Sequence, residues 1–233
     1  MGLAPWVRSL LNRAGIETAR KATLHHFLRT RHIDLVVDVG ANLGQFVGEI
    51  RERGYKGPLH SFEPVSKVFA ALEKKAARDP SWTVTRTALG AEPGEAHINL
   101  YEFDTLNSMH SIDAGSAQRL GVDPALRGVE TVPVTTLDLA LAGNDATSIL
   151  LKIDTQGHER AVLDGAGETL KRTSALLLEL PSEKLYENIW GFSEAIAHLD
   201  ALGFTPAQFR AVNTMNDDPA CAMEFDCLFR RKG

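Results

Sequence analysis

The sequence predicts an α/β fold of the Rossmann-like type, built around a mostly parallel, doubly wound sheet. From residue 33 onward, short apolar runs alternate with longer segments of helical periodicity. Strands that alternate with helices form parallel sheets with right-handed crossovers. A glycine-containing turn follows the first apolar run, where such sheets bind ligands. The 233 residues, 44% of them hydrophobic, are enough for one domain of this kind.

The apolar runs and helical segments follow one another in a regular order. We expect strands at 33–39, 58–62, 82–87, 149–153 and 175–180, with helices at 45–53 and 66–78 after the first two. Residues 94–135 fit this order poorly, because strand-like runs at 97–103 and 129–134 enclose a polar stretch. We interpret this part as an insertion beside the ligand-binding edge of the sheet. A last strand is expected at 223–229.

Residues 1–32 are predicted to form a helical extension that precedes the domain at 33–233. Between residues 3 and 29, apolar side chains recur near the helical period. Basic side chains accompany them at Arg8, Arg13, Arg20, Lys21, Arg29 and Arg31. Such a helix usually packs its apolar face on its own domain. Peripheral contact with an anionic membrane and a lid over the substrate are the two other roles that this pattern allows.

Composition and charge exclude several classes of protein. The formal net charge of −5 provides no positive field to hold nucleic acid. Cys221 and Cys227 are the only cysteines, too few for a disulfide framework or a zinc site of usual spacing. No apolar run approaches the roughly 20 residues that cross a bilayer, and no secretory signal is apparent. We therefore expect a cytoplasmic protein; the sequence does not indicate its oligomeric state.

The turn at 38–44 carries the first candidate binding residues. Gly40 and Gly44 permit positive backbone dihedral angles or a close backbone approach. Asp38 can pair with a cationic amino group or order the turn. Glu63 closes the second strand, where its carboxylate is well placed to accept hydrogen bonds from both hydroxyls of a ribose.

A glycine turn followed by an acid about 20 residues later also describes a dinucleotide site. A G-x-G-x-x-G turn brings pyrophosphate onto the helix terminus, but residue 42 here is Asn and residue 45 is Gln. S-adenosylmethionine has no phosphates, and its ammonium suits the acidic Asp38. Adenosylmethionine is thus the favoured cofactor. A nicotinamide-dependent oxidoreductase and a non-catalytic cofactor-binding module remain the alternatives.

Several stretches in order along the chain resemble one family, the FkbM-type methyltransferases. The resemblance covers roughly residues 33–230, which makes it more specific than any single motif. The matching stretches are residues 38–46 (DVGANLGQF), 61–64 (SFEP), 88–90 (ALG), 134–138 (VTTLD), 151–159 (LKIDTQGHE), 178–179 (LE), 203–204 (GF) and 226–229 (DCLF).

The resemblance implies a seven-stranded methyltransferase sheet with a reversed last strand. It also implies adenosylmethionine as donor and O-methylation of an acceptor hydroxyl, on sugars of glycans or glycolipids, on macrolides or on related natural products. It carries over Asp38, Gly40, Asn42 and Glu63 as cofactor contacts, together with Ala41 and Gly44 of the same loop. The region of Ala88 would lie near the adenine.

Methylation of an alcohol needs help with deprotonation, from a general base or from a metal ion. In the family topology, Asp154 and Glu179 would stand on the same carboxyl edge as Asp38, so both are catalytic candidates. Together they are also candidate oxygen ligands for Mg²⁺. His158 is a candidate base, since a neutral imidazole accepts protons at physiological pH. A surface histidine near a helix start is the alternative interpretation of His158.

Other polar residues near this edge have more than one interpretation. Lys152 points to the same strand face as Asp154, and a lysine inside an apolar strand needs a carboxylate partner, so a structural ion pair is expected. Glu159 either caps the following helix or binds substrate. Three residues of the insertion are candidates for acceptor contacts or ordinary loop residues: Asn107, Ser108 and His110.

Overall fold

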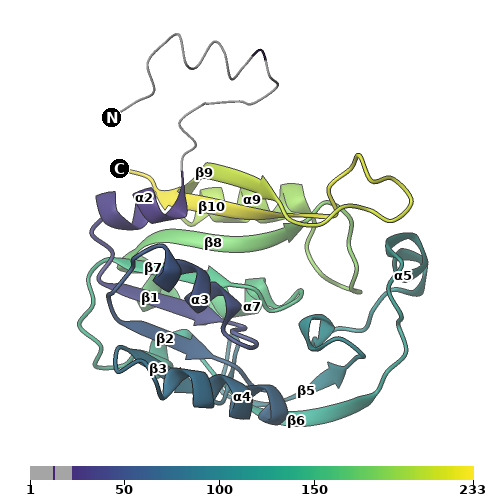
Figure 1. The fold of residues 1–233 in the computed structure, drawn as a ribbon, viewed down its shortest axis with the longest axis horizontal. Coiled ribbons are helices and arrows are strands. Elements are labelled where there is room, and N and C mark those ends of the chain that lie inside the picture. The colour runs from purple at the N-terminus through teal and green to yellow at the C-terminus, as the bar shows by residue number, and fades with distance from the viewer. Residues whose placement is uncertain (1–12, 14–22) are drawn as a thin grey trace.

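A seven-stranded sheet in the order β3-β2-β1-β7-β8-β10-β9 forms the centre of the fold (Figure 1). The structure is a computed structural model that describes Arg13 and residues 23–233. The strands are β1 (Leu35–Val39), β2 (Leu59–Phe62), β3 (Trp82–Thr85), β7 (Ile149–Ile153), β8 (Thr173–Pro181), β9 (Phe204–Ala211) and β10 (Glu224–Arg231). β10 runs antiparallel to both β8 and β9, whereas the other neighbouring strands are parallel. The predicted sheet with its reversed last strand is confirmed.

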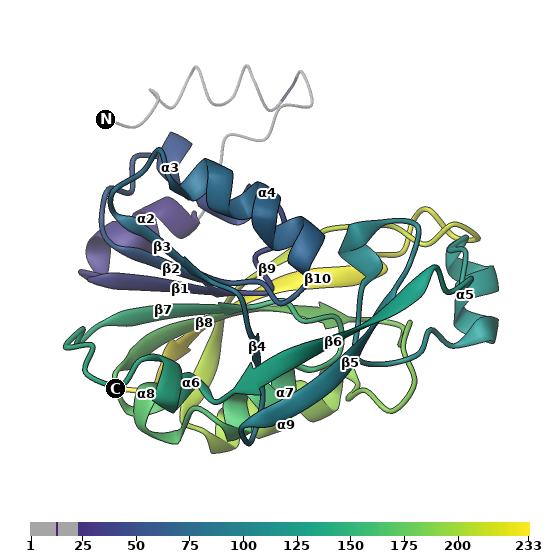
Figure 2. The ribbon, with the colours of Figure 1, turned by 90° about the horizontal axis from the view of Figure 1, so that it is seen from below.

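Helices cover both faces of this sheet (Figure 2). One face carries α2 (Leu24–Thr30), α3 (Gln45–Glu52) and α4 (Ser66–Ala76); the other carries α6 (Leu137–Ala140), α7 (Glu159–Asp164), α8 (Gly167–Lys171) and α9 (Phe192–Ala201). The central strands are apolar on both sides as a result. In β1, Val37 belongs to the core cluster beneath α6 to α9, and Val36 to the cluster beneath α2 and α3. Burial on both faces explains why such strands form unbroken apolar runs in the sequence.

The insertion forms a second, smaller sheet in the order β4-β6-β5. Its elements are β4 (Ala88–Leu89), β5 (Gly94–Leu100), the 3₁₀-helix η1 (Asp104–Leu106), α5 (Ala114–Leu120) and β6 (Gly128–Thr135). The strand expected at 97–103 thus begins and ends three residues early. It ends there because the chain turns back on itself, and Asn99 forms an isolated bridge with Ser108.

The third strand also departs from the prediction, and this departure shapes the site. The strand expected at 82–87 ends at Thr85. Beyond it the chain leaves the main sheet, and Ala88 pairs with Val134 of β6. The small sheet is thereby attached next to the carboxyl end of β2.

Helix α2 is the part of the predicted N-terminal helix whose packing is described. Its Phe27 and Leu28 are buried in one cluster with Ile33 and Val36. Within α2, the apolar face therefore packs on the domain. The rest of the helix predicted at 3–29 lies almost entirely outside the described residues, and the domain boundary after residue 32 stays a prediction. No described helix is long and apolar enough to cross a membrane.

Leu28→Ala should lower the free energy of unfolding by about 2–4 kcal/mol, because truncating a buried leucine removes apolar burial and leaves a cavity. Leu28 is only 4% exposed, whereas Arg29 on the same helix is exposed and provides the control. Urea unfolding would measure both variants, with Arg29→Ala expected within about 0.5 kcal/mol of the wild type. Equal midpoints for the two variants would show that α2 does not belong to the core.

Candidate active site

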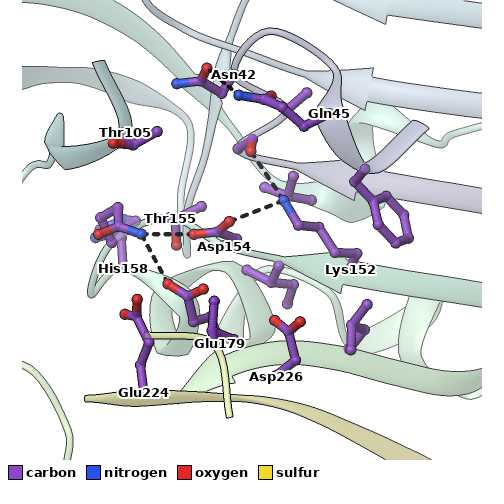
Figure 3. A pocket seen from close by; sticks show the side chains of 18 of the residues that line it. Asn42, Gln45, Thr105, Lys152, Asp154, Thr155, His158, Glu179, Glu224 and Asp226 are labelled. Atoms are coloured by element: carbon purple, nitrogen blue, oxygen red, sulfur yellow. Dashed lines mark hydrogen bonds and ion pairs between the residues drawn. The ribbon is translucent and has the colours of Figure 1, made fainter. Parts of the chain in front are cut away.

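A cavity of about 1120 Å³ opens where the carboxyl ends of β1, β2, β7 and β8 meet at one edge of the sheet. It continues over β10 and β9, and η1 lines it as well through residues that include Thr105, labelled in Figure 3. The predicted site residues that line it are Gly40, Ala41, Asn42, Glu63, Ala88, Asp154, His158 and Glu179. The structure thus brings eight of the ten predicted residues together; Asp38 and Gly44 are not part of the lining.

The turn after β1 requires glycine for two different reasons. Gly40 has a φ of 75°, and a Cβ atom there would lie 1.8 Å from the carbonyl oxygen of Asp154. Glycine therefore lets the backbones of the two strand ends approach each other at the cavity. Gly44 also has a φ of 75°, but a Cβ atom there would meet the ring of Trp82 at 2.6 Å. Gly44 thus serves the packing of α3 rather than the cavity lining.

Glu63 follows β2 at the cavity, and backbone hydrogen bonds hold both of its carboxylate oxygens. Its Oε2 accepts a hydrogen bond from the backbone N–H of Asn42 at 2.9 Å, and its Oε1 accepts one from the N–H of Val65 at 2.9 Å. Burial raises the pKa of Glu63 to about 7, although these two hydrogen bonds oppose the shift. Each oxygen keeps a further lone pair for a ligand hydroxyl.

An apolar wall lies beyond Glu63. Ala88 lines the cavity together with Val65 and Ile98, and the three residues belong to one apolar cluster. A flat aromatic base fits such a wall better than a charged group does.

Asp38 occupies a different environment from the one predicted. Its side chain is fully buried, its Oδ1 lies 3.1 Å from Nζ of Lys152, and its Oδ2 accepts a hydrogen bond from Ser61 Oγ at 3.2 Å. Lys152 thus neutralises this carboxylate beneath the cavity, and the direct contact with a ligand ammonium stays a prediction. The ion pair expected for Lys152 is present.

Asp154 stands at the end of β7 with both carboxylate oxygens held. Oδ2 lies 3.3 Å from Nζ of Lys152, and Oδ1 accepts a hydrogen bond from Nε2 of Gln156 at 2.9 Å (Figure 3). Burial alone would lower the pKa of Lys152, but Asp38 and Asp154 outweigh burial and raise it above its ordinary value. The Asp154 side chain is 30% exposed, so it remains accessible from the cavity.

The structure gives no support to the metal site predicted at Glu179 and Asp154. Nε2 of Gln156 lies 2.9 Å from Asp154 Oδ1 and 3.4 Å from Glu179 Oε1, so an N–H donor stands where a cation would need lone pairs. Burial and the neighbouring charge of Asp154 also raise the pKa of Glu179 well above its ordinary value, which favours the neutral form. Within residue 13 and residues 23–233, no group of three or more His, Cys, Asp or Glu side chains is arranged to hold a metal ion.

His158 lies at the N-terminal end of α7 and lines the cavity, as Figure 3 shows. Burial, with a smaller contribution from His110, lowers the pKa of His158 below its ordinary value. The two rings are tilted against each other with centroids 5.8 Å apart. His158 is therefore neutral at pH 7 and can accept a proton, which makes it more than a surface histidine.

Glu159 orders the loop between β7 and α7. It is buried, and its Oε1 accepts hydrogen bonds from the N–H and hydroxyl of Thr155 and from the N–H of Gly157, at 2.9–3.1 Å. Of its two predicted roles, the structure supports the one at the helix start. The loop in turn determines where Asp154 and His158 point.

The polar residues of the insertion have structural partners. Asn107 Oδ1 accepts a hydrogen bond from the N–H of Tyr101 at 2.9 Å, and Ser108 Oγ donates one to the carbonyl of Gln156 at 2.7 Å. Both residues line the cavity, whereas His110 does not belong to its lining. These hydrogen bonds within the protein explain why Asn107 and Ser108 are polar, without any contact to a substrate.

The sequence reasoning assigned no role to several residues that the structure places at the site. Gln156 follows Asp154 by two positions, so its place in a strand-end loop was the available signal. Arg210, Glu224 and Asp226 line the cavity from β9 and β10, and Tyr186 contacts Gln156 from the loop after β8. No local pattern in the sequence marks Arg210, Glu224 or Tyr186, whereas Asp226 begins the family-like stretch 226–229 but was assigned no role.

The sheet with its reversed β10, together with the cavity at its carboxyl edge, defines a protein with the Rossmann-like methyltransferase fold. The chain belongs to the FkbM methyltransferase family: the model of the methyltransferase FkbM domain matches residues 38–206. Membership of this family speaks against the alternative of a nicotinamide-dependent oxidoreductase.

The chain is similar to known proteins at two levels. It is 31% identical over 165 residues to 31-O-demethyl-FK506 methyltransferase FkbM of Streptomyces tacrolimicus, an alignment that covers 61% of this chain and 63% of that protein. The crystal structure of methyltransferase FkbM from Methylobacillus flagellatus KT superposes with a TM-score of 0.52 at 14% identity, covering 85% of this chain and 43% of that one. TehB from Haemophilus influenzae superposes with a TM-score of 0.50 at 9% identity, covering 97% and 67%. The chain thus spans 63% of the curated relative's length, and the two structures support the fold alone.

Proposed function

We propose that this protein transfers a methyl group from S-adenosylmethionine to a hydroxyl group of a sugar or another natural-product acceptor. The observation that carries the proposal is the position of Glu63. Its two oxygens, each oriented by a backbone N–H, line the same cavity as Asp154, at the ends of the two strands that flank β1. A carboxylate presented in this way suits the adjacent hydroxyls of a ribose.

The remaining lining suits the rest of the donor. The turn at Gly40 to Asn42 lines the cavity and would flank the methionine part, and the wall at Ala88 and Val65 suits the adenine. When bound, the sulfonium supplies an electrophilic methyl group. Asp38 is paired with Lys152 beneath the cavity, whereas the exposed part of the Asp154 carboxylate faces the sulfonium from the cavity wall.

Asp154 and His158 have separate roles toward the acceptor. Asp154 accepts a hydrogen bond from an acceptor hydroxyl next to the reacting one and thereby orients the acceptor, since the exposed part of its carboxylate keeps free lone pairs. The neutral His158 takes the proton of the reacting hydroxyl as the new O–C bond forms and the S–CH3 bond breaks, which releases S-adenosylhomocysteine. Both roles are performed by side chains, so the proposed reaction needs no metal ion.

The cavity floor over β8, β10 and β9 supports a polyhydroxylated acceptor. Two cross-strand rows of side chains form this floor. One row is polar, since Asp226 pairs in register with Glu179 on one side and Arg210 on the other. The next row is apolar where Leu228 lies opposite Leu177, and Gln208 follows on the β9 side. Adjacent polar and apolar rows suit a sugar ring, which has hydroxyls and an apolar face. The name of the 31%-identical relative likewise records an O-demethyl substrate.

An acceptor screen with radiolabelled S-adenosylmethionine tests the proposal. We expect label transfer to one class of hydroxylated acceptor, with equal rates in the presence and absence of a chelator. S-adenosylhomocysteine should raise the melting temperature, and NAD at the same concentration should not. Binding of S-adenosylhomocysteine without turnover on any acceptor would instead indicate a non-catalytic module. Loss of activity with chelator would contradict the metal-free mechanism.

The proposed base predicts the pH dependence of turnover. Because burial lowers the pKa of His158, kcat should rise with pH through an inflection below 6.5 and then stay level. His158→Ala should remove this inflection and lower kcat by about 100-fold, within the range of general-base catalysis. Initial rates between pH 5 and pH 8 would measure both effects. An unchanged inflection in His158→Ala would assign the base to another group.

A further inference from the structure

The side-chain amide of Gln156 contacts two carboxyl groups at the cavity. Its Nε2 donates hydrogen bonds to Asp154 Oδ1 at 2.9 Å and to Glu179 Oε1 at 3.4 Å. These two carboxyl groups come from different strands, β7 and β8. One amide group therefore links the two, while Lys152 holds the other oxygen of Asp154.

The other end of the Gln156 amide is anchored from outside the catalytic strands. Its Oε1 lies 3.0 Å from the hydroxyl of Tyr186, which also contacts the carbonyl of Leu106 in η1 at 2.9 Å. The carbonyl of Gln156 accepts a hydrogen bond from Ser108 at 2.7 Å. Tyr186 and Ser108 are 4% and 2% exposed, so solvent does not compete with these contacts. The single proton of the Tyr186 hydroxyl is shared between its two acceptors, Gln156 Oε1 and the Leu106 carbonyl. The cavity-lining segment 104–109 is thus bonded to Gln156 directly through Ser108 and linked to it indirectly through Tyr186.

The backbone at Gln156 is also held in an uncommon conformation. Its φ is 54°, in the left-handed region that a residue with a Cβ atom rarely adopts. Such strain persists where the surrounding contacts determine the conformation, and it is frequent at active sites. Here the contacts are those from Ser108, Tyr186 and Asp154.

We propose that Gln156 is a positioning residue, which orients Asp154 for the acceptor hydroxyl and couples that orientation to segment 104–109 through Tyr186 and Ser108. This role rests on the proposed methyl transfer, in which Asp154 touches the acceptor. Gln156 acts through Asp154 rather than on the reacting atoms.

Two variants of Gln156 separate this role from a purely structural one. Gln156→Glu keeps the length of the side chain but replaces the N–H donor by an acceptor beside two carboxyl groups. Gln156→Asn keeps the amide and tolerates a positive φ, but it is one methylene too short to bridge. Both should lower kcat by about tenfold or more, because hydrogen bonds to a charged group are lost. The affinity for S-adenosylhomocysteine should change by no more than about twofold, since Asp154 is not its main anchor. Gln118→Glu, exposed on α5, is the matched control.

Tyr186→Phe tests the coupling, because it removes only the hydroxyl. Alone it should lower kcat by about three- to tenfold, as expected for one neutral hydrogen bond in a buried network. In the Gln156→Asn background it should have no further effect on kcat, because the shortened amide no longer reaches Tyr186. Fold-changes that multiply in the double variant would mean that Tyr186 and Gln156 act independently, and would overturn the proposal.

NMR of the glutamine side-chain amides gives a readout that needs no turnover. In ¹⁵N-labelled protein, the signal pair that disappears in Gln156→Glu belongs to Gln156. This pair should shift in Asp154→Asn and in Tyr186→Phe, but not in Gln118→Glu. An unshifted pair in Asp154→Asn would overturn the proposed contact, whatever the kinetics. If the pair shifts in both variants but the wild type methylates no acceptor, the network is supported and only the proposed function is contradicted.

Discussion

Asp154→Asn is expected to lower kcat by about 100-fold or more, the effect of removing a group that orients or deprotonates the acceptor. The substitution keeps the volume and removes the charge. The exposed part of the Asp154 carboxylate is the part that faces the acceptor, while Lys152 and Gln156 hold the two oxygens. The fold and the affinity for S-adenosylhomocysteine should largely survive, because Lys152 keeps Asp38 as a partner. Steady-state kinetics on the acceptor found by screening would measure the loss.

Asp145→Asn is the matched control, since Asp145 is exposed in the loop that precedes the same strand. It should turn over like the wild type. A folded Asp154→Asn enzyme with near-normal kcat would place the catalytic edge elsewhere. A chelator distinguishes orientation of a hydroxyl by Asp154 from binding of a metal ion by Asp154. Full wild-type activity in the presence of chelator agrees with orientation of the hydroxyl. Loss of activity in chelator that added Mg²⁺ restores would instead assign a metal ion to Asp154.

Glu63→Ala should weaken the binding of S-adenosylhomocysteine by about tenfold or more, because two charge-assisted hydrogen bonds to the ribose are lost. Isothermal titration calorimetry would measure the change. Glu130→Ala is the control: Glu130 also accepts hydrogen bonds, from the N–H and hydroxyl of Ser66, but it does not line the cavity. Unchanged affinity in a folded Glu63→Ala variant would remove Glu63 from the site.

The pH dependence of the same binding provides an independent test. Glu63 has a pKa of about 7 in the free protein, raised by burial. Only the ionised carboxylate accepts both ribose hydrogen bonds, so binding should favour the ionised form and strengthen as pH rises. Affinity should level off above pH 7 and fall below it, by at most about tenfold for each pH unit. Glu63→Ala should remove this dependence, and a pH-independent wild type would contradict the assignment.

The architecture and the location of the site were predictable because they depend on local patterns. Hydrophobic runs at 33–39 and 149–153 are those of strands buried on both faces, and the helical periods between them imply parallel pairing. Parallel strands bring their carboxyl ends to one edge. Gly40, Glu63 and Asp154 therefore meet at one cavity although they lie far apart in the sequence.

Which polar groups face one another depended instead on tertiary packing. Asp38 was expected to meet a ligand, but the register that aligns it with Lys152 makes Lys152 its partner. Glu179 was expected to bind metal, but the register of β10 places Asp226 beside it, and Gln156 stands between it and Asp154.

Periodicity along the chain specifies which elements form and which edge of the sheet binds ligands, because both follow from the alternation of apolar and polar residues over a few turns or strands. It does not specify a contact such as that of Gln156 with Tyr186, which lie 30 positions apart. That contact depends on how the loop after β8 packs against the insertion, where Tyr186 shares an apolar cluster with Tyr101 and Ile112. Side-chain packing between distant segments decides such contacts, and it leaves no period in the sequence.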